Sequence, residues 1–142
     1  MIVLDSDHLS VLEYPEGDQA LRLRDRLRRS ADRDIHATAV SLEEQMRGWL
    51  AAIRGVQEVR RQVTYYSRLV GLVRFYANWR ILPFDDQAAE EFQRLRRVRV
   101  RIGTMDLKIA SIALVHDATL LSANLRDFEQ VPGLHVEDWI SK

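Results

Sequence analysis

Three apolar residues at the start of the chain, Ile2 to Leu4, run directly into Asp5 and Asp7 without an intervening turn. A short unbroken apolar run of this kind predicts a strand buried on both faces, as in parallel sheets covered by helices. In open α/β sheets, ligands bind beyond the carboxyl ends of the strands, which is where Asp5 would lie. Asp5 is therefore either a helix cap, a role that Asp7 could also fill, or part of a functional site.

The rest of the chain alternates short apolar runs with segments of helical spacing. Further strands are expected at residues 35–40, 81–84, 118–122 and 135–136. Helices are expected at residues 8–12 and 19–29, from Glu44 through Leu50, at 56–79, after Asp86 and after Thr104. The pattern predicts one α/β domain over residues 1–142, with a central, mostly parallel sheet of four to five short strands flanked by helices.

The helix through Leu50 and the helix over residues 56–79 predict a helical hairpin. An apolar stripe follows the second helix at Tyr65, Leu69, Leu72, Val73 and Tyr76. A stripe of this kind is usually part of the core. Because it is longer than one helix needs to cover a small sheet, a dimer surface or a groove for a partner helix is also consistent with it.

Several polar residues have a simple capping interpretation. Ser41 and Glu44 have the spacing of a capping box, which alone would account for Glu44. Asp85 and Asp86 are expected at the N-cap and in the first turn of one helix, and Thr104 at the N-cap of another.

Asp106 needs a different explanation. It precedes Ile109 and Ala110 by three and four residues, so it projects from the buried face of its helix. An acid on that face must find a partner inside the protein. The small residues Ala110 and Ala113 allow the helix to approach the sheet closely, which brings Asp106 towards the end of the first strand.

Composition excludes several classes of site. The 142 residues include no cysteine, so disulfides, thiolate nucleophiles and Cys-type zinc sites are excluded. Nothing resembles a signal peptide or a membrane span, and we expect a soluble, cytoplasmic protein without membrane association. Of the 21 basic residues, only Lys108 and Lys142 are lysines. Arginine suits RNA or an acidic protein partner, although genomic base composition explains the bias equally well.

Acidic positions follow the predicted strands at one edge of the sheet, after the strands at residues 2–4, 35–40 and 118–122, with Asp106 nearby. Packed carboxylates raise one another's pKa, so such a cluster needs a cation. Oxygen ligands without Cys or His at ligand spacing favour Mg²⁺ or Mn²⁺. A site of this kind suits hydrolysis of a phosphodiester by metal-activated water.

Four segments resemble the motifs of PIN-domain ribonucleases, and the closest group is the toxins of VapBC toxin–antitoxin pairs. These segments are Ile2–Asp7, Ser41–Glu44 with Gly48, Ile102–Ala110 and Ser122–Phe128. The resemblance covers essentially the whole chain. It implies a three-layer PIN-like fold with a protruding helical hairpin and an Mg²⁺-dependent endoribonuclease. It also implies a homodimer that acts on RNA and is inhibited by a cognate antitoxin.

The same resemblance assigns the site residues. Glu44 is chosen over Glu43 because its distance to Gly48 matches the family pattern. The implied catalytic residues are Asp5, Glu44, Asp106 and Asp127. The implied ligands of Mg²⁺ (or Mn²⁺) are Asp5, Glu44, Asp106 and Asn124. The supporting residues are Asp7, Ser41, Thr104 and Ser122, and the RNA-binding residues are Arg97, Arg99, Arg101 and Arg126.

Four positions depart from the family pattern. Asp7 stands where the family usually has Asn, and Asn124 stands where many members have Asp, so the two changes offset each other in charge. Ser6 and Ser122 replace the commoner threonines. These changes leave open the number of metal ions and whether Asn124 or Asp127 fills the fourth acidic position.

Two other functions are consistent with parts of the sequence. The spacing of Asp5 and Asp7 also resembles haloacid-dehalogenase-type phosphatases, in which Asp5 would be the nucleophile and Asp7 the acid/base. That chemistry needs a lysine near the phosphate, and Lys108 lies on a different helix face from Asp106. A non-catalytic PIN-like module that binds RNA or protein is the other alternative.

Overall fold

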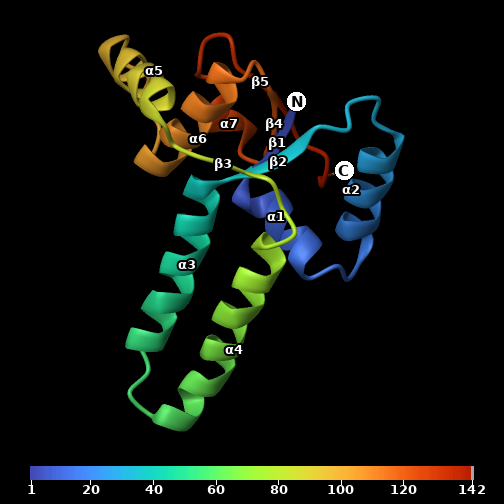
Figure 1. The fold of residues 1–142 in the computed structure, drawn as a ribbon, viewed down its shortest axis with the longest axis vertical. Coiled ribbons are helices and arrows are strands. Elements are labelled where there is room, and N and C mark those ends of the chain that lie inside the picture. Colours follow the sequence, from blue (N-terminus) through green and yellow to red (C-terminus); the bar gives the residue numbers. More distant parts are fainter. Residues whose placement is uncertain (142) are drawn as a thin grey trace.

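In the computed structural model, which describes residues 1–141, five parallel strands form one sheet in the order β3-β2-β1-β4-β5 (Figure 1). The strands are β1 Ile2–Leu4, β2 Ile35–Thr38, β3 Ile81–Leu82, β4 Thr119–Leu121 and β5 His135–Glu137. The predicted α/β class, the strand number and the parallel sheet are therefore confirmed.

Seven helices surround the sheet in the part of the chain that the structure describes. They are α1 Ser6–Glu13, α2 Asp18–Arg29, α3 Ala39–Arg54, α4 Val59–Tyr76, α5 Asp86–Arg97, α6 Thr104–Val115 and α7 Leu125–Phe128. No helix among residues 1–141 combines the length and the apolar character that crossing a membrane requires.

The central strand β1 is buried on both faces, as its apolar run predicts. Val3 packs with residues of α5 and α6, including Leu95 and Ile109, in one apolar cluster. Ile2 and Leu4 face the opposite side and pack with residues of α1, α2 and α4 in a second cluster. Since alternate residues of a strand point to opposite faces, one three-residue strand joins both cores of a three-layer fold.

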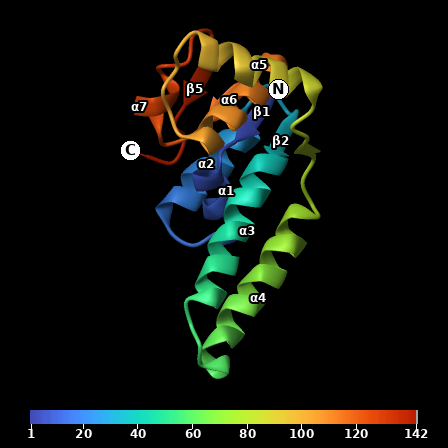
Figure 2. The same cartoon turned by 90° about the vertical axis from the view of Figure 1, so that its left-hand side faces the viewer.

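Helices α3 and α4 form the predicted hairpin, which extends away from the sheet (Figures 1 and 2). The apolar stripe of α4 is only partly core. Leu72 and Tyr76 are buried, and Tyr65 packs on Trp49 of α3 with the ring centroids 6.1 Å apart. Val73, predicted with them, is instead exposed, because a rotation of about 100° per residue along α4 turns it away from the buried side that Leu72 occupies.

Two predicted helix starts are wrong. Thr38 ends β2 and caps α3 by accepting a hydrogen bond from the backbone N–H of Ser41 at 3.0 Å, so α3 begins at Ala39. Ser41 therefore lies inside the helix, and the predicted capping box with Glu44 does not form. Similarly, the N-cap of α6 is Gly103 rather than Thr104, without a side-chain cap. The caps predicted for α5 are confirmed, because Asp85 accepts from the N–H of Ala88 at 3.0 Å.

Candidate active site

The order of the strands reverses between β1 and β4, which lie side by side in the sheet. The two strands end together, and the backbone N–H of Asp5 donates to the carbonyl of Leu121 at 2.9 Å. In open parallel sheets, a reversal of this kind opens a crevice at the carboxyl ends of the strands. The residues that follow β1 and β4, Asp5 and Ser122, therefore lie at the expected place for a site.

Asp5 is both a helix cap and a member of the site, so the two interpretations of its position are compatible. Its Oδ1 accepts from the N–H of Ser6 at the start of α1 at 2.7 Å, and its Oδ2 accepts from the hydroxyl of Ser122 at 2.7 Å. Only 6% of Asp5 is exposed. This burial, together with the negative charge of Asp7, raises the pKa of Asp5 to about 7.

Asp7 is held by three donor groups from two residues, His8 and Ala123. Its carboxylate accepts from the backbone N–H and the ring Nδ1 of His8, both at 2.6 Å, and from the N–H of Ala123 at 2.8 Å. His8 is fully buried, and its Nε2 accepts from the N–H of Trp139 at 3.1 Å, so its proton lies on Nδ1. The negative charge at this position is thus fixed in place beside Asp5.

Glu44 approaches the site from α3. Because Thr38 caps that helix, the side chain of Glu44 is not used in a capping box, and its Oε1 accepts from the hydroxyl of Ser6 at 2.6 Å. Ser6 therefore positions Glu44 relative to α1. The sequence singles out Ser6 only as a replacement of threonine, and its role depends on a contact between residues 38 positions apart.

Asn124 links the two remaining acids. Its Nδ2 donates to Oδ2 of Asp106 at 3.2 Å and to Oδ2 of Asp127 at 3.1 Å. Asp106 is half-buried, as its place on the inner face of α6 predicts. Burial and the charges of Glu44 and Asp127 raise the pKa of Asp106 above its usual range.

We call Asp5, Asp7, Glu44, Asp106 and Asp127 the carboxylate cluster. Among residues 1–141, no three Asp, Glu or His side chains stand close enough to share one ion, so holding an ion in common requires the side chains to move closer. The donor set nevertheless fits a hard divalent cation. Its ligands are carboxylate oxygens, and the raised pKa of Asp5 and of Asp106 reflects in part a repulsion that a cation would relieve.

The other predicted supporting residues lie outside the cluster. Ser41 is buried at the start of α3, where its backbone and hydroxyl both contact Thr38. Thr104 is exposed at the start of α6. Ser122 is the one predicted supporting serine that contacts the cluster, through Asp5 and, at 3.4 Å, through Asp7.

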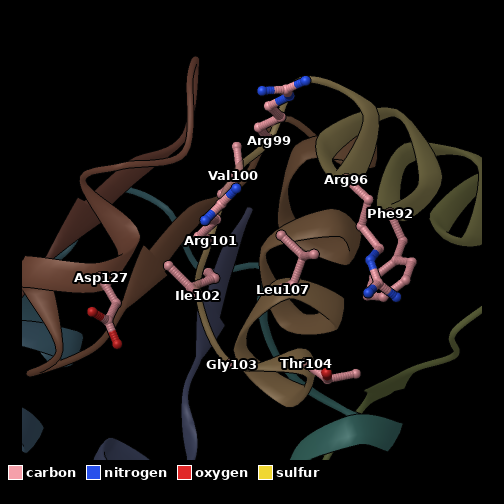
Figure 3. Close-up of a pocket in the computed structure, with 10 residues that line it drawn as sticks. All are labelled: Phe92, Arg96, Arg99, Val100, Arg101, Ile102, Gly103, Thr104, Leu107 and Asp127. Atoms are coloured by element: carbon pink, nitrogen blue, oxygen red, sulfur yellow. The ribbon is translucent and has the colours of Figure 1, made fainter.

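A cavity of about 560 Å³ adjoins the cluster between the end of α5 and the start of α6 (Figure 3). We call it the arginine cavity, because Arg96, Arg99 and Arg101 line it. Figure 3 shows the segment from Arg99 to Gly103 with Asp127 on one side and Arg96 against Phe92 on the other. The full lining is Phe92, Arg96, Arg99, Val100, Arg101, Ile102, Gly103, Thr104, Leu107 and Asp127.

Two of the four predicted RNA-binding arginines line this cavity. Arg97 contributes instead to other hollows along α5, and Arg126 is exposed on α7. Arg96, which the sequence did not single out, takes the place expected for Arg97. Its guanidinium lies 5.5 Å from the ring centroid of Phe92, and the i, i+4 spacing of these two residues could have indicated this pairing.

Lys108 lies away from the site. Its ammonium lies 5.7 Å from the ring centroid of Phe84, in a hollow formed with residues of α5. The phosphatase interpretation requires a lysine beside the phosphate that Asp5 would attack, and Lys108 does not supply it.

Comparison with known proteins identifies relatives. A family model described as PIN domain matches residues 2–134. A tRNA(fMet)-specific endonuclease VapC of Salmonella typhimurium is 35% identical over 69 residues, which cover 46% of this chain and 52% of that protein. Ribonuclease VapC1 of Rickettsia felis is 38% identical over 60 residues, which cover 39% and 45% of the respective chains. The chain thus spans about half the length of these relatives.

Solved structures with a similar fold cover nearly the whole chain. VapBC2 from Rickettsia felis, bound to a DNA fragment from its promoter, has a TM-score of 0.69 at 22% identity and covers 98% of this chain and 99% of that one. VapBC-1 from nontypeable Haemophilus influenzae has a TM-score of 0.70 at 18% identity and covers 99% of this chain and 100% of that one. At these identities the similarity shows a shared fold.

Proposed function

The chain belongs to the PIN domain family, and on this basis we propose that it is a metal-dependent endoribonuclease, the toxin of a toxin–antitoxin pair. The carboxylate cluster at the junction of β1 and β4 carries the proposal. Buried acids with a raised pKa at the ligand-binding edge of a parallel sheet are a frequent sign of a catalytic site. The two curated relatives described above are named as a ribonuclease and an endonuclease, which supports the same activity.

The proposed ligands of Mg²⁺ or Mn²⁺ are Asp5, Glu44, Asp106 and Asn124. A bound divalent cation would neutralise the acids, activate water for attack on phosphorus and offset the charge that develops on the leaving oxygen. Ser122 and Ser6 orient Asp5 and Glu44 by donating hydrogen bonds to them. The bond from Ser122 favours the charged, ligating form of Asp5.

We assign to Asp127 the acceptance of a proton from the attacking water. Asn124 donates a hydrogen bond of 3.1 Å to one carboxylate oxygen of Asp127. Asp127 also lines the arginine cavity. Asp127 therefore stands between the acids that would hold the ion and the cavity. Asp7 has a different role, because the donors around it fix its charge beside Asp5, and we assign it to positioning.

The proposed partners are an RNA substrate, a protein antitoxin and a second copy of the chain, and the proposed location is the cytoplasm. Several solved structures with this fold are VapBC complexes, which supports an antitoxin. The homodimer and the cytoplasmic location stay predictions.

RNA cleavage tests the proposal directly. The purified protein is incubated with labelled total RNA in Mg²⁺, in Mn²⁺ and in EDTA, beside the Asp106→Asn and Asp25→Asn variants. Asp25 lies on the exposed surface of α2 beside Arg29 and is a matched control for loss of one carboxylate. We expect metal-dependent cleavage by the wild type and by Asp25→Asn, and none by Asp106→Asn. Cleavage by Asp106→Asn at the wild-type rate would contradict the proposed site. If none of the three proteins cleaves RNA under any of these conditions, a non-catalytic binding module is favoured.

A further inference from the structure

The end of α5 has a backbone conformation that is unusual for the residue found there. The N–H of Arg99 donates to the carbonyl of Arg96 at 3.1 Å, and the N–H of Val100 donates to the carbonyl of Leu95 at 3.1 Å. These two bonds form a Schellman motif, whose left-handed position usually holds glycine. Here that position is Arg99, with φ at +64°. A residue with a Cβ is disfavoured in this conformation, so an advantage of the arginine side chain would explain its presence.

Arg96, Arg99 and Arg101 give the arginine cavity three positive charges, against the one carboxylate of Asp127 in its lining. Among residues 1–141, no carboxylate lies within ion-pair distance of Arg96, Arg99 or Arg101. Arg94 on the same helix is different, because its Nε lies 3.1 Å from both carboxylate oxygens of Glu91. Guanidinium groups free of acidic partners are suited to bind phosphate.

The rest of the lining suits a nucleoside. Val100, Ile102 and Leu107 supply apolar surface, and Arg96 is stacked on the ring of Phe92 (Figure 3). Apolar and aromatic side chains beside arginines are typical of surfaces that bind single-stranded nucleic acid. The volume of about 560 Å³ lies within the range of small-ligand pockets.

The arginine cavity is continuous with the carboxylate cluster through Asp127. This residue lines the cavity, and Asn124 connects it to Asp106. An RNA strand whose scissile phosphate lies at the cluster would therefore have its next nucleotide beside the arginines.

We propose that the arginine cavity is a subsite for single-stranded RNA that binds the nucleotide adjacent to the cleaved phosphodiester. Arg99 and Arg101 bind its phosphate, and Arg96 with the apolar lining contacts its base or ribose. The inference rests on the proposed ribonuclease function and names the part of the substrate that this surface recognises. An acidic peptide is the competing ligand, but it would make no use of the apolar and aromatic lining.

Substitution of Arg99 by glycine separates binding from stability. The Arg99→Gly variant removes the side chain and relieves the left-handed backbone, so its melting temperature is expected to equal or exceed that of the wild type while RNA binding weakens. Asp117→Gly is a matched control. Asp117 has φ at +49° in the same motif at the end of α6, outside the arginine cavity. It should match the stability effect without changing RNA affinity.

RNA affinity is measured by fluorescence anisotropy with a short fluorescein-labelled single-stranded RNA in EDTA, over a series of salt concentrations. Arg99→Gly and Arg101→Ala should each weaken binding about 10-fold. Each should also reduce the slope of log affinity against log salt by about 0.7, the value for one phosphate contact on a single strand. Arg94→Ala, on the same helix but beside Glu91, serves as the control for loss of one positive charge.

The outcomes distinguish the subsite from the activity. If the wild type binds and cleaves RNA while Arg99→Gly and Arg101→Ala retain its affinity and salt slope, the subsite is wrong and the activity stands. If the wild type neither binds nor cleaves RNA, the proposed function and the subsite both fail. If the two variants lose binding of a labelled poly-glutamate peptide but keep that of RNA, the cavity is a peptide site and the proposal is overturned.

Discussion

The hydroxyl of Ser122 donates to Oδ2 of Asp5 at 2.7 Å, across the two strands where the order of the sheet reverses. Both residues are buried. The bond counteracts the burial that raises the pKa of Asp5, because a donated hydrogen bond stabilises the ionised carboxylate. A residue 117 positions away thus controls how readily the first acid of the site gives up its proton.

Removal of that hydroxyl should make Asp5 harder to ionise. In Ser122→Ala we expect the pKa of Asp5 to rise further above 7, with a loss of about 1 to 3 kcal/mol in the free energy of unfolding at pH 8. Titration of the carboxyl carbons by NMR in metal-free buffer measures the first effect, and urea denaturation the second. Ser122→Thr keeps the hydroxyl and should restore both values. An unchanged pKa in Ser122→Ala would show that the bond has no influence on ionisation.

The ionised form of Asp5 should destabilise the metal-free fold at neutral pH. An aspartate in the unfolded chain ionises near pH 4, whereas Asp5 in the folded chain keeps its proton up to about pH 7. Between these values the folded state binds more protons, so the free energy of unfolding falls as pH rises. Asp5→Asn avoids this loss and should be more stable at pH 8 by up to about 4 kcal/mol, with no gain near pH 4. Urea denaturation of both proteins in EDTA at pH 4 and pH 8 measures this difference in the free energy of unfolding. If Asp5→Asn is less stable than the wild type at pH 8, the prediction is wrong.

Divalent metal should stabilise the wild type more than a variant that lacks one of the proposed ligands. If the cluster shares a Mg²⁺ or Mn²⁺ ion, the wild type gains about 2.7 kcal/mol at a metal concentration 100 times its dissociation constant. Asp106→Asn should lose most of the gain, and Asp25→Asn on the surface of α2 should keep it. Thermal melting in EDTA and in a Mn²⁺ series measures the shift. Equal shifts for all three proteins would show that the ion binds elsewhere.

Ser6 should affect activity through the position of Glu44. We expect Ser6→Ala to lower kcat by about 10-fold while KM changes little, because the hydroxyl contacts Glu44 at 2.6 Å rather than the substrate. Ser6→Thr retains a hydroxyl and should recover most of the rate. Single-turnover cleavage of RNA in Mg²⁺ measures both variants, and an equal loss in Ser6→Ala and Ser6→Thr would argue against the hydrogen bond as the cause.

Asp7 distinguishes positioning from direct participation in the reaction. Asp7→Asn removes a negative charge that raises the pKa of Asp5, so the pKa of Asp5 should fall and the acidic limb of the pH–rate profile should move to lower pH. The rate at pH 8 should stay within about 10-fold of the wild type, because the substitution removes no proposed ligand. Abolished cleavage in a folded variant would place Asp7 in the chemistry itself.

Local patterns in the sequence predict the sheet and most of the site. Apolar runs that end in polar residues locate the ends of β1 and β4, and the helical position of Asp106 relative to Ile109 predicts its half-buried environment. The prediction fails at the start of α3, where Thr38 and Ser41 are both good N-cap residues. The choice of Thr38 depends on where β2 stops pairing with β3, which local sequence does not specify.

Other features depend on contacts that no local pattern contains. His8 positions Asp7 only because the backbone of Trp139, 131 residues later, donates to its ring. Arg96 rather than Arg97 lines the arginine cavity, because rotation of about 100° per residue along α5 turns Arg96 towards Phe92 and the cavity. The single domain over residues 1–142 and the metal ion stay predictions.

The pairing of β1 with β4 determines when the site can form during synthesis. Strand β1 leaves the ribosome well before its partner β4, because Thr119–Leu121 lies more than 110 residues behind it in the chain. Closing a loop of that length is slow and is opposed by chain entropy until the partner strand is present. Because Asp5, Asp106 and Asp127 come to the same edge of the sheet only after this closure, the carboxylate cluster cannot assemble on a nascent chain before β4 has emerged from the ribosome.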